Sequence, residues 1–271
     1  MGPMPGLAGK RALIIGGAGP GNGGASSRAL AAGGAAVAIA DFNAERASAL
    51  ADELQTEHGI KAAGLAVDVR EPAALDAVVA DAVGVLGGLD VLVTVVGGHT
   101  LFAPWARLDE TSDEDWDLIV TLNLGYVMRA ARAAIRTYLA QGTGGTIVSV
   151  GSMSGERSSP YAAAYGAAKA GLVNLARSVA LEYARDGIRM NVVSLGATTS
   201  DANRAIDSTA LGYLDTIPMG RLADNVEVAS TVAFFASDAS SYITGEMVLV
   251  DGGITKRFPL AVPKAPSYVA G

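Results

Sequence analysis

Short apolar runs alternate with longer stretches of helical periodicity along most of the chain. The apolar runs predict strands at residues 10–15, 35–40, 62–67, 91–96, 146–150 and 189–195. The stretches between them predict helices at residues 25–32, 44–57, 73–86, 113–139 and 162–185. Apolar strands that alternate with helices are typical of a parallel sheet covered on both faces. The pattern therefore predicts an α/β fold with a doubly wound parallel β-sheet.

Two segments lack this alternation. Residues 197–221 mix polar and apolar positions without a clear period. They follow a predicted strand end, where open α/β sheets bind ligands, so a substrate loop and an ordinary surface insertion both fit them. Residues 258–271 carry three prolines, and we expect an extended tail there. No linker divides the pattern, so we expect one domain over residues 1–271.

A glycine-rich turn at residues 16–24 separates the first predicted strand from the first predicted helix. It satisfies both G-x-x-x-G-x-G, through Gly17, Gly21 and Gly23, and G-x-G-x-x-G, in a second frame. Such a turn lets the backbone approach a pyrophosphate closely at a helix N-terminus. Glycines also serve plain tight turns, but the position between strand and helix favours dinucleotide binding.

Asp41 ends the second predicted strand, where a carboxylate can accept hydrogen bonds from the ribose hydroxyls of adenosine. It would repel the additional phosphate of NADP. The next residue is Phe42 rather than an arginine, so the sequence offers no evident compensating cation there. The alternative is a helix-capping aspartate, because a helix is expected from residue 44. We expect a preference for NAD.

Tyr165 and Lys169 lie four residues apart in a stretch predicted to be helical, so their side chains share one face. Lys169 is one of only five lysines. A nearby cation favours a phenolate, and we therefore expect Lys169 to lower the pKa of Tyr165. A phenol tuned in this way can exchange a proton with an alcohol or carbonyl oxygen. Ser152 lies thirteen positions before Tyr165; only this spacing distinguishes it from other nearby serines.

Composition narrows the chemistry further. The absence of cysteine excludes disulfides and thiolate sites, and the two histidines, His58 and His99, form no metal-ligand cluster, so we expect no metal. The net charge of −7 argues against a nucleic-acid or anionic-membrane partner. The N-terminus lacks the pattern of a signal peptide, and the apolar runs are too short to span a bilayer. We expect a cytoplasmic protein.

Taken together, these residues resemble the short-chain dehydrogenase/reductase family, and the resemblance covers essentially the whole chain. The glycine turn is similar to the family's cofactor loop. The other matching positions, in chain order, are Asp41, Asp68 with Val69, Asn123, 147–152, Tyr165 with Lys169, Asn191, 194–196, 218–222, 237–245 and 250–253. The resemblance implies a single-domain Rossmann fold, with a cofactor half at about residues 8–150 and a catalytic and substrate half at about 151–257.

The resemblance also implies a catalytic set. Tyr165 would act as the general acid/base, and Ser152 would hydrogen-bond the substrate oxygen. Lys169 would hold the nicotinamide ribose and depress the pKa of the tyrosine. Asn123 would position a water that relays protons. Hydride would pass directly between the nicotinamide and the substrate carbon.

Two further sets follow from the same resemblance. The cofactor-binding residues would be Gly17, Gly21, Asn22, Gly23, Asp41, Phe42, Asp68, Val69, Gly97, Tyr165, Lys169, Gly196, Thr198 and Ser200. The substrate pocket would be lined by His99, Met153, Ser154, Tyr161 and Leu211. For His99, a hydrogen bond to the substrate and a bond to the backbone of its own loop are both open.

The chain departs from the family pattern at several positions. Residues 94–97 read Thr-Val-Val-Gly where the family usually has Asn-Asn-Ala-Gly. Gly16 replaces a common threonine, Asn22 an isoleucine and Leu195 a proline. These changes affect hydrogen bonding around the cofactor, but none removes a group that does chemistry.

The expected function is an NAD(H)-dependent interconversion of a secondary alcohol and a ketone. Because the expected pocket is mostly apolar or neutral, the substrate is expected to be neutral and bulky or cyclic, such as a steroid-like alcohol. The alternatives are a 3-oxoacyl thioester reductase and a non-catalytic NAD-binding sensor. By resemblance, the chain forms a homotetramer through the helices after Asn123 and Tyr165 and through residues 247–250.

Overall fold

The computed structural model describes residues 4–199 and 214–256, and these ranges contain a seven-stranded, wholly parallel β-sheet. The strands are β1 (Arg11–Ile15), β2 (Ala36–Asp41), β3 (Ala62–Ala66), β4 (Val91–Thr94), β5 (Gly145–Ser152), β6 (Ile188–Leu195) and β7 (Met247–Val250). Their order across the sheet is β3-β2-β1-β4-β5-β6-β7. The predicted doubly wound parallel sheet is confirmed.

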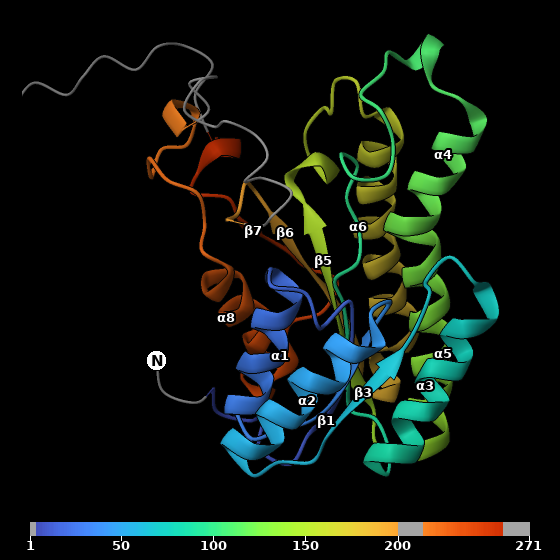
Figure 1. Cartoon of the computed structure of the whole chain (residues 1–271), viewed down its shortest axis with the longest axis vertical. Coiled ribbons are helices and arrows are strands. Elements are labelled where there is room, and N and C mark those ends of the chain that lie inside the picture. Colours follow the sequence, from blue (N-terminus) through green and yellow to red (C-terminus); the bar gives the residue numbers. More distant parts are fainter. Residues whose placement is uncertain (1–3, 200–213, 257–271) are drawn as a thin grey trace, which may run out of the picture.

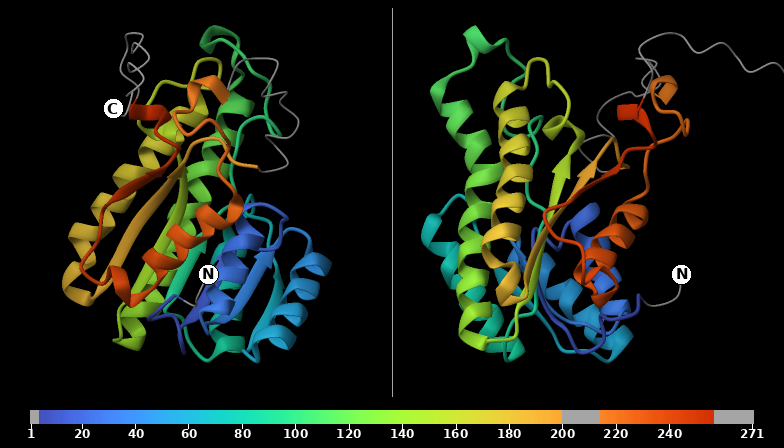
Figure 2. Two further views of the ribbon diagram at one scale, coloured as in Figure 1. Left: turned by 90° about the vertical axis from the view of Figure 1, so that its left-hand side faces the viewer. Right: turned by 180° about the vertical axis from the view of Figure 1, so that it is seen from behind.

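Helices cover both faces of the sheet (Figures 1 and 2). On one face lie α1 (Asn22–Ala32), α2 (Ala44–His58) and α8 (Asn225–Ala236). The other face is covered by α3 (Pro72–Leu86), α4 (Asp113–Val120), α5 (Tyr126–Gln141) and α6 (Ala163–Tyr183). Each layer buries its own apolar cluster against the sheet, since strand side chains alternate between the two faces.

Local sequence explains where several helices begin and end. The Asn43 side chain accepts a hydrogen bond from the backbone of Arg46 at 2.9 Å and caps α2. Gly59 ends that helix in the left-handed conformation that glycine adopts without strain. At α8, Asp224 and Glu227 form a capping box.

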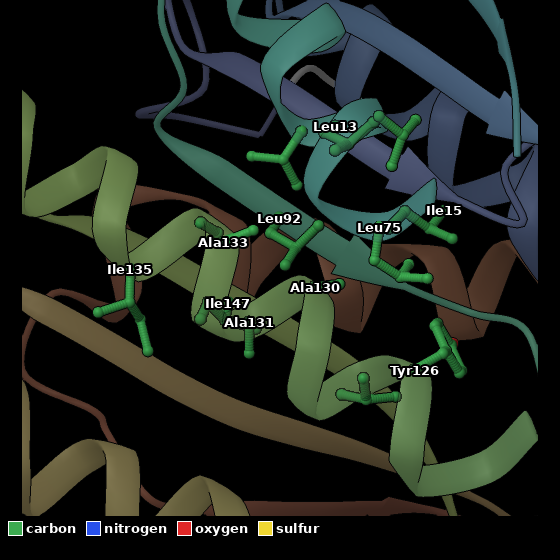
Figure 3. Packing of buried hydrophobic residues seen from close by; sticks show 14 of the residues in the cluster. Leu13, Ile15, Leu75, Leu92, Tyr126, Ala130, Ala131, Ala133, Ile135 and Ile147 are labelled. Carbon is green, nitrogen blue, oxygen red and sulfur yellow. The ribbon is translucent and has the colours of Figure 1, made fainter. Parts of the chain in front are cut away.

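The core between the sheet and α5 is built from small and branched side chains. Figure 3 shows Leu13, Leu92 and Ile147 of three strands in one apolar layer with Ala130 and Tyr126 of α5. The alanines let the helix approach the sheet closely, and interiors packed in this way resist changes in volume.

The strand order reverses between β1 and β4, which are neighbours in the sheet although β2 and β3 separate them in the chain. The loops that leave these two strands therefore diverge at one edge and create a crevice. Close to the strand ends the two loops still pack together, since a Cβ added to Gly16 would lie 2.7 Å from Val96 Cγ2.

Two elements close to the crevice differ from the sequence-based expectation. β4 ends at Thr94 rather than at residue 96, although Val95 N–H still donates to the Ile15 carbonyl at 2.9 Å. The helix expected at 113–139 is interrupted by a π-helical turn, Thr121–Gly125, where Tyr126 N–H bonds to the Thr121 carbonyl. Such wide turns depend on tertiary contacts that hydrophobic periodicity does not report.

By length and composition alone, the continuous helical span Asp113–Gln141 is apolar enough to cross a membrane, contrary to the expectation from apolar runs. The core helix of a soluble protein passes the same test. In this structure 56% of the apolar window is buried inside the fold.

Candidate active site

A cavity of about 480 Å³ opens at the carboxyl ends of the central strands. Its wall combines the start of α1, the loop after β4, the end of β5, the first turns of α6 and the segment after β6. The predicted residues that line it are Asn22, Gly97, His99, Ser152, Met153, Ser154, Tyr165, Lys169, Gly196 and Thr198. Residues far apart in the sequence thus meet at one site, as expected for the switch point of such a sheet.

The glycine-rich turn brings the N-terminus of α1 to this cavity. Gly17 and Gly21 lie in the turn, and Gly21 occupies the N-cap position, where no side chain caps the helix. A Cβ on Gly23 would lie 1.9 Å from the Gly16 carbonyl oxygen, so only glycine permits this close backbone approach. The Asn22 Oδ1 atom is buried without a hydrogen-bond partner among the described residues. The helix N-terminus, which no side chain caps, fits the pyrophosphate part of a dinucleotide, whereas the Asn22 Oδ1 atom is an acceptor and can bind only a hydrogen-bond donor.

Asp41 lies at the tip of β2, next to the same turn. Its Oδ2 atom accepts a hydrogen bond from Ala18 N–H and its Oδ1 atom accepts one from Asn43 N–H, both at 3.1 Å. Because Asn43 caps α2, the alternative interpretation of Asp41 as the helix cap is wrong. The carboxylate instead connects the end of β2 to the glycine turn.

Phe42, Asp68 and Val69 lie close to Asp41 at the ends of β2 and β3. Val69 is buried, whereas the Phe42 ring is 74% exposed. The Asp68 carboxylate is paired with Arg70, whose guanidinium lies over the Phe42 ring. This region is separate from the cavity wall at the central strands.

Lys169 is the most deeply buried charged side chain at the site, with 4% of its surface exposed. Its Nζ atom donates a hydrogen bond to the Val150 carbonyl at 3.1 Å and lies 5.7 Å from the centroid of the Tyr165 ring. Burial lowers the pKa of the ammonium to about 8. Lys169 can therefore change its protonation state near neutral pH.

The predicted direction of the Tyr165 pKa is wrong for this structure. Burial raises the pKa of the phenol above its usual value, and the side-chain hydrogen bond with Ser152 only partly opposes this effect. Burial and Ser152 are the two influences on this pKa, and the effect of burial is the larger. The phenol is therefore protonated at neutral pH and can donate to an oxygen placed beside Ser152.

Asn123 lies behind the cavity wall, in the π-helical turn, and is fully buried. Its Nδ2 donates to the carbonyls of Gly98 and Ile119, and its Oδ1 accepts from Gly98 N–H, each at 2.9 Å. Gly97 has a φ of +154°, and a Cβ there would lie 2.6 Å from Asn123 Oδ1 and 3.2 Å from Lys169 Nζ. Asn123 thus fixes the loop after β4 against the wide helical turn.

The substrate end of the cavity is lined by His99, Met153 and Ser154 together with Leu101 and Trp105, which the sequence did not single out. His99 Nε2 lies 3.1 Å from the Pro104 carbonyl oxygen, so the expected alternative of a backbone-bonded histidine is observed. Its ring also meets Trp105 edge-on, with 5.1 Å between centroids.

Tyr161 does not line this cavity. It is 59% exposed and is the one described non-glycine residue with a positive φ, at 63°. Its carbonyl accepts a hydrogen bond from Ala106 N–H at 3.1 Å, which connects the two loops at the mouth. The predicted residues Ser200 and Leu211 lie outside the described residues.

The departures from the family pattern are accommodated locally. The Thr94 hydroxyl donates to Ser149 Oγ at 2.9 Å and links β4 to β5. Leu195 is buried at the end of β6. Thr94 thus has a hydrogen-bond partner and Leu195 packs in the core, whereas the Oδ1 atom of Asn22 has no partner among the described residues. In the described ranges, no group of three or more His, Asp or Glu side chains is placed to hold a metal ion.

Comparisons with known proteins agree with this geometry. A family model described as enoyl-(acyl carrier protein) reductase matches residues 17–255. The chain is 39% identical over 250 residues to 4-formylbenzenesulfonate dehydrogenase of Comamonas testosteroni, covering 90% of this chain and 97% of that protein. It is 37% identical over 227 residues to a 3-oxoacyl-[acyl-carrier-protein] reductase of Escherichia coli (strain K12), covering 80% and 91%. Identity to 3beta-hydroxysteroid dehydrogenase 2 of Eggerthella lenta is 34% over 257 residues, covering 92% and 96%.

Solved structures are similar over the same extent. The crystal structure of gox2181 superposes with a TM-score of 0.85 at 33% identity, covering 92% of this chain and 97% of that one. A short-chain type dehydrogenase/reductase from Mycobacterium marinum gives a TM-score of 0.85 at 32% identity with the same coverage. The chain therefore belongs to the short-chain dehydrogenase/reductase family of oxidoreductases.

Proposed function

We propose that the protein is an NAD(H)-dependent oxidoreductase that interconverts a secondary alcohol and a ketone by hydride transfer. The observation that carries the proposal is the convergence of Ser152, Tyr165 and Lys169 on one cavity, with Asn123 directly behind it. A nicotinamide cofactor would supply the hydride acceptor or donor. We propose a neutral and bulky or cyclic alcohol, because the described substrate end combines apolar side chains with uncharged polar ones.

The residues have separable roles in this mechanism. Ser152 holds the substrate oxygen, and Tyr165 donates a proton to it during ketone reduction, for which the protonated phenol is ready. In the oxidative direction the phenol must first lose its proton. A charged Lys169 beside the ring then stabilises the phenolate. Asn123 keeps Gly97 and Gly98 in place and would position a proton-relaying water.

The cofactor end supports a dinucleotide. Gly97, Gly196 and Thr198 line the cavity beside Lys169, which would hold the nicotinamide ribose. The start of α1 would receive the pyrophosphate. Asp41 has acceptor capacity left on both carboxylate oxygens and would bind the adenosine ribose, which favours NAD over NADP.

The test is a turnover assay of the purified protein with NAD and a panel of secondary alcohols, and with NADH and the matching ketones. Tyr165→Phe should lower kcat by about a thousandfold or more and leave the dissociation constant for NAD within about threefold, since general acid/base catalysis is lost while the cleft persists. Tyr161→Phe is the matched control, because Tyr161 is exposed and outside the cavity. Substantial turnover by Tyr165→Phe would refute the assignment.

A second candidate is a 3-oxoacyl thioester reductase. The relatives that carry this activity in their names support it, as does the protonated state of Tyr165, which suits reduction. Asp41 argues against it if such reduction draws on NADPH. Including a 3-oxoacyl thioester with NADH and NADPH in the panel separates the two. Tight NAD binding without turnover of any substrate would instead favour a non-catalytic NAD-binding protein.

We also propose a homotetramer. β7 is an edge strand of the described sheet, and Val248 on it is 39% exposed. Met128 and Leu139 on α5 and Leu181 on α6 expose apolar surface as well. Sedimentation velocity of the purified protein measures the assembly directly.

A further inference from the structure

A compact group of side chains lies at the carboxyl ends of β2 and β3, away from the catalytic cavity. Val67 N–H donates to the Asp41 carbonyl at 3.0 Å, so the ends of the two strands lie side by side. Phe42 follows Asp41 directly, and the Cζ atom of Arg70 lies 5.7 Å from the centroid of the Phe42 ring. The group therefore places an arginine over the residue that follows Asp41, the carboxylate expected to choose the cofactor.

Asp68 holds this arginine in place. Asp68 Oδ1 accepts from Arg70 N–H and Nε–H at 2.9 Å each, and Oδ2 accepts from Nη2 at 2.6 Å and Nε at 3.1 Å. These bonds lower the pKa of the Asp68 carboxyl and keep it ionised. Both oxygens of the carboxylate are thereby bonded to Arg70.

The ion pair with Asp68 engages only some of the N–H donors of Arg70. Within the described residues its Nη1 group makes no hydrogen bond, and 54% of the side chain is exposed. A guanidinium has five N–H donors and binds phosphate through a planar fork. Arg70 thus has N–H donors available for a ligand, but the negative charge of Asp68 neutralises the positive charge of the guanidinium. The three ionised side chains together leave one net negative charge.

We infer that Arg70 is a latent phosphate-binding residue for the 2′ position of the adenosine ribose, and that Asp68 suppresses it and so strengthens the preference for NAD. The inference rests on the proposed role of Asp41 in binding that ribose. A 2′-phosphate carries nearly two negative charges and meets the net negative charge of the group. Cofactor choice would then depend on two carboxylates, Asp41 and Asp68, rather than on Asp41 alone.

The test compares the binding of 5′-AMP and 2′,5′-ADP to the full chain by isothermal titration calorimetry at low ionic strength. These ligands differ only in the 2′-phosphate, and their binding does not depend on turnover. Asp68→Asn keeps the shape and an acceptor for Arg70 N–H but removes the charge. Removing one negative charge close to a dianionic phosphate in a water-like dielectric should raise the affinity ratio for 2′,5′-ADP over 5′-AMP by about 5- to 10-fold.

Two further variants assign the effect to Arg70. Arg70→Gln should lower the affinity ratio, because it removes the cation and leaves both carboxylates. In Asp68→Asn combined with Arg70→Gln, the ratio should return to within about twofold of the unmodified protein. Asp186→Asn changes the charge equally at the opposite, amino edge of the sheet and should leave the ratio unchanged.

The outcomes separate this inference from the proposed function. No rise in the ratio for Asp68→Asn, or a rise that persists in the double variant, overturns the role of Arg70 even if the unmodified protein prefers NAD. Failure of the unmodified protein to bind 5′-AMP, or its preference for 2′,5′-ADP, overturns the assignment of Asp41 and this inference with it. An unchanged circular dichroism spectrum verifies that each variant is folded.

Discussion

Replacement of Lys169 by methionine should stabilise the folded protein at neutral pH while abolishing turnover. Burial lowers the pKa of this lysine from 10.5 to about 8, which corresponds to a penalty of roughly 3 kcal/mol wherever the side chain is charged. Methionine relieves this penalty but loses the hydrogen bond to the Val150 carbonyl at 3.1 Å, and this loss costs about 1–2 kcal/mol. Methionine fills similar space without a charge. The expected net gain is therefore about 1–2 kcal/mol in the free energy of unfolding.

The dependence of protein stability on pH shows whether the buried charge of Lys169 causes the difference. Lys169 holds its proton less tightly in the folded state than in the unfolded chain, so the unfolded state binds more protons between pH of about 8 and 10.5. The stability of the unmodified protein should rise with pH through that window. The methionine variant lacks this titration, and its advantage should shrink over the same range. Below about pH 8 both states are charged and the full penalty applies.

The assay is urea unfolding followed by circular dichroism at pH of about 7 and about 10, without dinucleotide. Lys61→Met is the matched control, because Lys61 is exposed and its replacement removes a charge without relieving burial. A Lys169→Met variant less stable than the unmodified protein at neutral pH would refute the reasoning. So would a stability difference that is the same at both pH values.

Two other substitutions test the scaffold of the site. Gly97→Ala would place a Cβ 2.6 Å from Asn123 Oδ1; it should lower kcat/KM by about a hundredfold and stability by about 1–3 kcal/mol, and unchanged kinetics would contradict the proposed contact. Asn191→Ala removes buried hydrogen bonds to the Ile243 carbonyl at 2.9 Å and from Glu246 N–H at 3.0 Å. It should cost about 2–4 kcal/mol in urea unfolding, and a loss below about 1 kcal/mol would show that the loop before β7 relaxes.

Much of the fold could be predicted because its determinants are local. Each described apolar run that was interpreted as a strand is a strand, and the glycine turn lies between β1 and α1 as expected. The candidate site could be predicted from the same alternation of strands and helices. Residues placed after strand ends, or four apart on one helix, meet wherever parallel strands share an edge.

The features that were not predicted depend on burial and on contacts between distant segments. Spacing alone pairs Tyr165 with Lys169, but only the fold reveals that burial raises one pKa and lowers the other. The bonds between Asn123 and Gly98 join the wide helical turn to the loop after β4, two segments that periodicity treats separately. The pairing of Arg70 with Asp68 is close in sequence, yet its relation to Phe42 requires the sheet register.

The π-helical turn Thr121–Gly125 has a consequence for how this protein can vary. One additional residue in a helix shifts the angular phase of everything after it by about 100°. α4 buries only Ile119, whereas α5 buries eight side chains, so the two segments present differently composed faces to the fold. A deletion within the turn would rotate the apolar face of α5 relative to α4, so the length of this helix is constrained more strictly than its composition.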